Sequence, residues 1–180
     1  MRDQTVATLQ ARFGVDTAQA ARVRQVALAM LQSSGQDGAG AGVGSEAADA
    51  PRELGWACDL HEIGLMVSHH DHHRHSAYLM AHVDAAGFSQ SQQRRIADLV
   101  LGQRGGLRKI EAQLASERFA WQVLALRLAA IKCHARGPVD LKALRLKRDG
   151  RTARLLFRPA WAERNPRTMH LLREEVQAWA

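Results

Sequence analysis

The sequence is poor in cysteine and aromatic residues, and it has no long apolar run. Of its 180 residues only two are cysteines, Cys58 and Cys133, and 5% are aromatic. One cysteine pair cannot form the disulfide framework of a small secreted protein, and no stretch of about 18 apolar residues could span a membrane. The first residues, MRDQTVATLQ, also lack the apolar core of a signal peptide. These absences predict a cytoplasmic protein with reduced thiols and no membrane contact.

The sequence does contain enough apolar residues for a folded core, and its charge is unevenly distributed. Apolar residues make up 46% of the chain, and the formal net charge is +7. Residues 136–158 hold eight basic and two acidic side chains, whereas residues 1–135 are almost balanced. Such a basic segment attracts polyanions through a salt-dependent field. It is equally typical of the solvent-exposed face of a small sheet, which must be polar.

Apolar periodicity predicts helices through the first three quarters of the chain. Asp16 and Ser89 can each cap a helix, and each is followed by a glutamine three residues later. Apolar residues recur at helical spacing after both caps, and we expect further helices over about 52–65, 76–86 and 117–136. Residues 33–50 are rich in glycine, which predicts a flexible loop.

The apolar period changes after Gly137-Pro138. Apolar and basic residues then alternate on both sides of Asp149-Gly150, a dipeptide that favours a tight hairpin turn. Asn165-Pro166 predicts the cap and first residue of a final helix. We therefore expect a mainly α protein, with a helical domain over residues 1–135 and a small basic ββα domain over residues 136–180.

Seven of the nine histidines lie between His61 and His82. Imidazoles near carboxylates suit several transition metals, and the candidate ligands would be His61, Glu62, His73 and His75. The alternative is a polar turn between helices, in which the histidines cap helix ends or bind anions when protonated. We favour the second interpretation and predict no metal ligand, because spacing alone does not supply the convergent geometry of a metal site.

One short motif is more specific. His61-Glu62-Ile63-Gly64 resembles the His-Asp-x-Gly step of HD-type metal phosphohydrolases, which are helical domains. This resemblance places the early histidine of the metal shell at Gln19 and its final aspartate within Leu128–Ile131, which reads Leu-Ala-Ala-Ile. An amide, a longer carboxylate and no final aspartate make a poor metal shell. The resemblance therefore implies an HD-like helical domain without metal chemistry.

Longer segments resemble the C-terminal half of the Ppx/GppA family of exopolyphosphatases and guanosine pentaphosphate phosphatases. The segments are ARFGVDTAQAARV, LHEIGLMVSHHDHHRHSAYL and GFSQSQQRRIADLV, and the match covers roughly residues 1–180. It departs from the family at Gln103-Arg104, where His-Arg is common. The resemblance implies an HD-like helical domain followed by a small α/β domain, as a fragment of a longer enzyme or a stand-alone relative.

The same resemblance implies that catalysis lies elsewhere. In this family, phosphoanhydride hydrolysis and Mg²⁺ binding belong to two actin-like N-terminal domains with glycine-rich phosphate loops, and no such loop occurs in this sequence. The resemblance therefore implies no catalytic residue and no cofactor in this chain. It also implies that this half binds polyphosphate and contributes to a homodimer, and it leaves open whether the ligand is polyphosphate or pppGpp.

A polyphosphate-binding surface needs repeated cationic donors, and arginine supplies planar, bidentate ones. The candidates in the helical part are His73, Arg74, His75, Arg94, Arg104, Arg108 and Lys109. Each has an alternative interpretation as ordinary exposed surface.

Two other functions stay open. One is a metal-dependent HD phosphohydrolase that acts on a nucleotide, with His61 among its ligands. The other is nucleic-acid binding through the arginine-rich ribbon between Arg145 and Arg158, although neither a recognition helix nor an aromatic stacking motif accompanies that ribbon. We favour polyanion binding without hydrolysis, and we do not expect a nucleic-acid partner.

Overall fold

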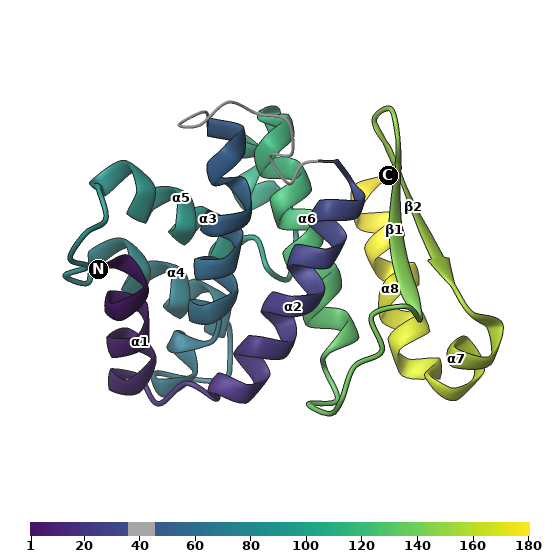
Figure 1. Cartoon of the computed structure of the whole chain (residues 1–180), viewed down its shortest axis with the longest axis horizontal. Coiled ribbons are helices and arrows are strands. Elements are labelled where there is room, and N and C mark those ends of the chain that lie inside the picture. The colour runs from purple at the N-terminus through teal and green to yellow at the C-terminus, as the bar shows by residue number, and fades with distance from the viewer. Residues whose placement is uncertain (36–45) are drawn as a thin grey trace.

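A computed structural model describes residues 1–35 and 46–180. In this part of the chain, helices precede a single β-hairpin, and two further helices follow it (Figure 1). The helices before the hairpin are α1 (Arg2–Arg12), α2 (Thr17–Ser33), α3 (Glu46–Leu60), α4 (His72–His82), α5 (Gln90–Leu101) and α6 (Glu117–Lys132). Short 3₁₀ helices lie at η1 (Ile63–Met66), η2 (Arg108–Ile110) and η3 (Gln113–Ala115). The C-terminal elements are β1 (Leu144–Asp149), β2 (Thr152–Phe157), α7 (Pro159–Arg164) and α8 (Pro166–Trp179).

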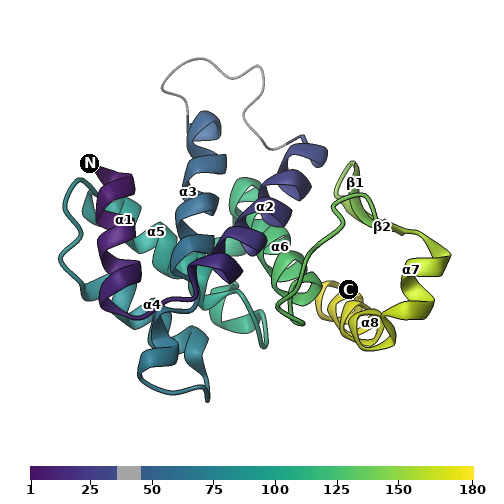
Figure 2. The ribbon, with the colours of Figure 1, turned by 60° about the horizontal axis from the view of Figure 1, so that its bottom comes forward.

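The core lies where α2, α3 and α6 pack against one another in the middle of the molecule. Helix α6 is apolar on most of its faces, so it is buried among the other helices. Figures 1 and 2 show α1, α4 and α5 on one side of these three helices, and the hairpin with α8 on the other. The predicted fold class is confirmed: the protein is mainly helical, with a small hairpin near its C-terminus.

Side-chain caps fix the starts of several helices as the sequence predicts. Asp16 Oδ1 accepts a hydrogen bond from the Gln19 backbone N–H at 3.0 Å and so caps α2. Ser89 and Gln92 form a complete capping box at the start of α5. Asn165 and Pro166 take the cap and first positions of α8. The Asn165 side chain, however, donates to the Trp161 carbonyl instead of accepting from the helix.

The predicted boundaries of three helices are wrong. Helix α3 begins at Glu46 rather than near residue 52, so residues 46–50 of the predicted loop are helical, and residues 36–45 lie outside the described residues. The sequence EAADA supplies strong helix formers, and α3 continues through Pro51. It ends at Leu60 rather than 65. Helix α4 spans residues 72–82 rather than 76–86, and α6 ends at Lys132 rather than 136.

The hairpin pairs Leu144 with Phe157 and Asp149 with Thr152 in antiparallel register. Its turn centres on Gly150, whose φ of +60° is a conformation that favours glycine. The predicted alternation holds in β1, where Leu144 and Leu146 are buried, but β2 lies mostly exposed. An apolar hollow of about 950 Å³ separates the hairpin from α6 and α8. None of the described helices has both the length and the apolar character needed to cross a membrane.

Candidate anion-binding site

The His61-Glu62 pair follows directly after α3 and faces a cleft. His61 is only 3% exposed, and its Nδ1 lies 2.6 Å from the Cys58 carbonyl oxygen. A carbonyl only accepts, so Nδ1 carries the proton, and Nε2 faces Glu62 Oε1 at 3.9 Å. Burial lowers the pKa of His61, and the nearby Glu62 carboxylate opposes this shift. The His61 imidazole is therefore held neutral and oriented by the helix before it.

Gly64 joins this pair to helix α4. Its N–H donates to Ser76 Oγ at 2.8 Å. A β-carbon on Gly64 would lie 2.4 Å from both the His72 carbonyl oxygen and the Ser76 nitrogen, which leaves no room for any other residue. The glycine of the motif is therefore required by the close approach of two backbone segments, and this approach brings the first turn of α4 beside His61.

Gln19 and Gln103 take structural roles in the cleft. The Gln19 amide donates through Nε2 to the Cys133 carbonyl at 2.8 Å and accepts through Oε1 from Arg22 Nε at 3.1 Å. Gln103 is buried and donates through Nε2 to the His61 carbonyl at 2.7 Å. Gln19 thus uses both polar side-chain atoms within the protein, and Gln103 uses its Nε2.

Arg136 occupies the space beside the acidic member of the pair. It has a left-handed backbone, with φ of +53°, a conformation that costs a non-glycine residue energy. Its guanidinium donates to Glu62 Oε1 at 2.6 Å and to Asp16 Oδ2 at 3.1 Å. The pKa of Asp16 is lowered by its hydrogen bond from the Gln19 N–H and by Arg136. Glu62 thus has a cationic partner supplied by the protein itself.

The residues of the HD resemblance come together, but they do not form a metal shell. Gln19, His61, Glu62, Ala130 and Ile131 all line one cleft of about 720 Å³, which we call the His61 cleft. Within residues 1–35 and 46–180, no three His, Cys, Asp or Glu side chains converge as a metal site requires. His73 and His75 therefore do not complete a site with His61 and Glu62, and the donor set does not fit a metal ion.

Four of the seven predicted polyphosphate-binding residues surround one loop and helix start. We call them the Lys109 cluster: His73, Arg74, Arg104 and Lys109. A β-carbon on Gly105 would lie 3.0 Å from Lys109 Nζ and 3.8 Å from His73 Nε2, so both side chains border this glycine. Lys109 Nζ donates to the carbonyls of Arg104 and Gly106, the latter at 2.9 Å, which ties it to the loop.

The lowered pKa values of His73 and Lys109 indicate that positive charge is concentrated in the Lys109 cluster. Burial, Lys109 and Arg104 lower the pKa of His73 to about 4. Burial and the fields of Arg127, Arg74 and Arg104 lower the pKa of Lys109 to about 8. His73 is 5% exposed, and its Nδ1 has no hydrogen-bond partner in the described residues. An added anion would relieve this mutual repulsion.

Among the described residues, no side-chain hydrogen bond or ion pair joins the other three predicted residues to the cluster. His75 is half-buried, and because it lies two residues after His73, it faces a roughly opposite side of α4. Arg94 is exposed on α5, where its charge lowers the pKa of Asp98 against the larger, opposing effect of burial. Arg108 is exposed in η2. Their role in polyphosphate binding stays a prediction.

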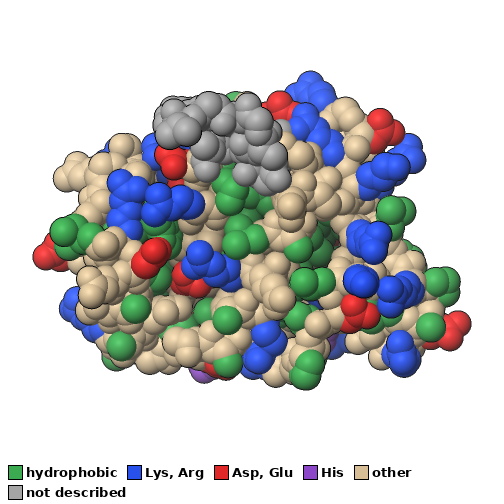
Figure 3. Space-filling view, in the orientation of Figure 1, with side chains coloured by type: hydrophobic (Ala, Val, Ile, Leu, Met, Phe, Trp, Pro, Cys, Tyr) green, Lys and Arg blue, Asp and Glu red, His purple; other side chains and the backbone are tan. Residues whose placement is uncertain are grey.

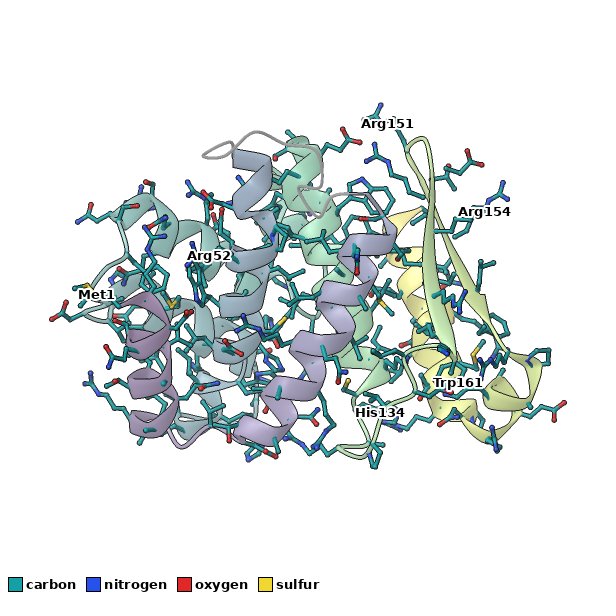
Figure 4. The ribbon with its side chains drawn as sticks, viewed as in Figure 1. Met1, Arg52, His134, Arg151, Arg154 and Trp161 are labelled. Carbon is teal, nitrogen blue, oxygen red and sulfur yellow. The ribbon has the colours of Figure 1, made fainter. Side chains whose placement is uncertain are left out.

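Sequence reasoning missed several side chains of the His61 cleft. His72 lines it, and burial followed by the Arg104 charge lowers the pKa of this histidine to about 4. His134 lies where α6 ends, with Nε2 2.8 Å from Thr168 Oγ1 of α8 (Figure 4). Arg167, together with Leu171 and Ala178, lines the cleft from α8. These three recur at helical spacing, a signal that could have placed them on one face.

The protein has the features of an HD-like helical domain. It is mainly helical with a small hairpin, and its His-Glu-x-Gly motif packs on the next helix. The chain matches the family model of Ppx/GppA phosphatase, domain III, over residues 1–176, and it therefore belongs to this family.

Three curated relatives are each named guanosine-5'-triphosphate,3'-diphosphate pyrophosphatase. The protein from Vibrio vulnificus is 30% identical over 170 residues, 93% of this chain and 33% of the relative. The protein from Photobacterium profundum is 29% identical over 178 residues, 98% of this chain and 35% of the relative. The protein from Vibrio atlanticus is 30% identical over 170 residues, with the same shares as the first. The chain thus spans about a third of the length of these relatives.

Proposed function

We propose that this domain binds inorganic polyphosphate, or the related phosphoanhydride chain of pppGpp, without hydrolysing it, and that it supports dimerisation of a Ppx/GppA-type phosphatase. The observation that carries the proposal is the convergence of His73, Arg74, Arg104 and Lys109 from two distant segments on one loop. A linear polyanion needs several cationic donors in a row and no catalytic group. The names of the relatives support a phosphoanhydride as the ligand class.

The electrostatics of the Lys109 cluster favour an anionic ligand. Burial and the nearby positive charges lower the pKa of Lys109 to about 8 and that of His73 to about 4, so that His73 is a neutral hydrogen-bonding group near pH 7 beside three basic side chains. Among the described residues, none of the four forms an ion pair with a carboxylate. Arg74 and Arg104 are exposed, so both guanidinium groups are free to make charge-assisted hydrogen bonds to phosphate.

The first experiment measures binding of labelled polyphosphates of graded length to the chain by fluorescence anisotropy, at two salt concentrations, with duplex DNA as competitor. We expect affinity to rise with polyphosphate length and to resist the DNA. Phosphate release in the presence of Mg²⁺ is measured on the same samples, and we expect none above background.

Variants then separate the cluster from general charge. Arg74→Gln with Lys109→Gln removes two cluster cations, and we expect affinity to fall at least about tenfold, since hydrogen bonds to charged groups contribute about 1.5–3 kcal/mol each. Arg12→Gln with Arg164→Gln removes the same charge from two exposed positions outside the predicted binding residues and serves as the matched control. Equal losses in both variants would show that the binding surface is not the Lys109 cluster.

Dimerisation has its own measurement. Light scattering coupled to size-exclusion chromatography gives the mass of the chain in solution, and we expect the mass of two copies. A mass of one copy across the accessible concentration range would remove dimerisation from the proposed function and leave polyanion binding untouched.

A further inference from the structure

The His61 cleft has a different chemistry from the Lys109 cluster. It is a hollow of about 720 Å³, within the range of roughly 300–1,000 Å³ typical of pockets for small organic ligands. Its walls come from the starts of α2 and α4, one face of α8 along its length, the residues just after α3, the loop after α5, and the C-terminal half of α6 with the turn after it. A linear phosphate chain needs only a row of cations, whereas this hollow has both charged and apolar walls.

The cationic partner of the cleft is built into the protein. Arg136 contacts Glu62 at 2.6 Å, and its second branch contacts Asp16 at 3.1 Å. The turn that follows α6 holds Arg136 in a left-handed conformation, which aims its side chain back across the cleft. The guanidinium therefore neutralises Glu62, the carboxylate that would be a metal ligand according to the HD resemblance.

Two further arginines remain available after the internal ion pairs are counted. Arg127 forms a bidentate ion pair with Glu175, and Arg136 forms an ion pair with Glu62. Arg104 lines the cleft from the loop after α5 and Arg167 from α8, and within the described residues neither has a carboxylate partner. The remaining acid of the lining, Glu174, lies 3.2 Å from His170. Two exposed guanidiniums facing one hollow can bind a short chain of phosphates.

The apolar part of the lining offers room for a nonphosphate group. Ile131 and Leu171 are partly exposed and contribute branched aliphatic surface, and the small side chains of Ala130 and Ala178 leave the hollow open between them. Aliphatic walls beside a few convergent polar groups are the usual composition of a small-molecule site. A planar base or a ribose could lie on this surface while its phosphates reach Arg104 and Arg167.

We propose that the His61 cleft is a second anion site, one that binds a nucleoside triphosphate, with Arg136 paired to Glu62, the carboxylate that the HD resemblance would make a metal ligand. The phosphates are held by Arg104 and Arg167, and the nucleoside by the aliphatic wall of α6 and α8. The site needs no divalent metal for binding. It shares Arg104 with the Lys109 cluster, and its other groups are distinct, so the two sites are separable by substitution.

The test is isothermal titration of the 180-residue chain with GTP, ATP, guanosine and tripolyphosphate, in EDTA. We expect at least one of the two nucleotides to bind about tenfold or more tightly than both tripolyphosphate and guanosine, because only a nucleotide uses both walls. Equal affinity for the nucleotides and tripolyphosphate, or nucleotide binding that appears only after a divalent metal is added, overturns the proposal.

Substitutions locate the site. Ala178 is exposed and lines the cleft, so Ala178→Trp fills the hollow without disturbing the core, and we expect nucleotide affinity to fall at least about tenfold. Gln177→Trp places the same side chain on the neighbouring position of α8, which lines neither hollow, and is expected to bind as the original chain does. Unchanged affinity in Ala178→Trp overturns the proposal.

The result is independent of the polyphosphate proposal. Arg74→Gln with Lys109→Gln is expected to weaken long polyphosphate while nucleotide binding remains. A chain that binds nucleotide and not polyphosphate removes polyphosphate from the proposed function and leaves this inference standing, and a chain that binds polyphosphate while Ala178→Trp changes nothing removes this inference alone.

Discussion

Gly64 shows how the smallest residue of the histidine motif holds two segments together. A β-carbon there would meet backbone atoms of His72 and Ser76 at 2.4 Å, and backbone cannot move aside as a flexible side chain can. We expect Gly64→Ala to lower the free energy of unfolding by about 1–3 kcal/mol or more. Urea denaturation measures it. Gly106→Ala is the control, because a β-carbon on Gly106 meets nothing within 4 Å; equal effects at both positions would contradict this account.

His73 makes stability depend on pH. Its pKa is lowered to about 4 in the folded chain by burial, Lys109 and Arg104, against about 6.5 when unfolded. Between these values the unfolded chain binds more protons, so stability rises with pH over this window and falls as the solution is acidified. Full protonation costs on the order of 3 kcal/mol from this group alone, at about 1.4 kcal/mol per pH unit.

The measurement compares urea unfolding at pH 7 and pH 4.5 in the original chain and in His73→Asn. We expect the variant to lose less stability on acidification, whatever its stability at pH 7. His69→Asn, at an exposed position, keeps the original pH dependence. The same dependence in all three chains would show that His73 is not the group responsible.

At the scale of elements, α8 is attached to α6 by one buried ion pair. Arg127 donates to both carboxylate oxygens of Glu175, at 2.6 and 2.8 Å, and also to the Gly102 carbonyl. Trp179 Nε1 donates to the same carboxylate at 2.8 Å. This arrangement forms the wall between the His61 cleft and the apolar hollow, since Glu175 lines both.

Breaking that pair on one side leaves a buried charge without a partner. We expect Arg127→Leu to destabilise the chain by about 3–5 kcal/mol. The double variant Arg127→Leu with Glu175→Leu should recover much of the loss, because two apolar side chains can replace a buried ion pair. Thermal unfolding followed by tryptophan fluorescence measures both. A double variant less stable than the single one would mean that the pair is favourable in itself.

The elements themselves were largely predictable from local signals. Asp16 and Ser89 cap their helices as predicted, because capping depends on residues a few positions apart. The predicted hairpin is present, but its two turn residues are Gly150 and Arg151, one position after the predicted Asp149-Gly150. The start of α4 was not predictable in the same way. Its first turn consists of histidines after an Asp71 in left-handed conformation, and tertiary contact through Gly64 holds it.

The site was predictable only in part, because a local motif identifies some of its residues whereas tertiary packing places the others. The HD resemblance led to Gln19, His61 and Glu62, and these residues do share one cleft. Arg136 and Arg167 were missed as members of that cleft, because tertiary packing places both. Arg136 reaches it from the turn after α6 through its contacts with Asp16 and Glu62, and Arg167 reaches it from α8. Charge patterning identified residues 136–158 as basic, yet only Arg136 of that stretch lines the cleft.

For the whole molecule, basic residues gather in places that lie far apart. Figure 3 shows Lys and Arg side chains over the hairpin side of the molecule, and Figure 4 shows Arg151 and Arg154 projecting from the hairpin. Helix α4, which carries His73 and Arg74, lies on the other side of the α2–α3–α6 core in both ribbon views. The hairpin charge and the Lys109 cluster are therefore separate basic surfaces of the molecule.

This separation gives a prediction about nucleic acid. Arg145, Lys147 and Arg151 are exposed on the hairpin and form no ion pair within the described residues. Replacing all three with glutamine removes three of the positive charges that a duplex could contact. We expect weaker DNA binding, with the slope of log affinity against log salt reduced by roughly 0.9 for each lost phosphate contact.

Short polyphosphate should respond differently to the same triple variant. At physiological ionic strength, exposed charges act over a Debye length of about 8 Å, so the hairpin cations are screened from a ligand held at the Lys109 cluster. We expect the affinity for such a ligand to change less than about threefold, while Arg74→Gln with Lys109→Gln shows the opposite pattern. Fluorescence anisotropy with both ligands on both variants separates the two surfaces. If the triple variant lost polyphosphate and DNA to the same extent, the hairpin, and not the Lys109 cluster, would be the polyanion-binding surface of this domain.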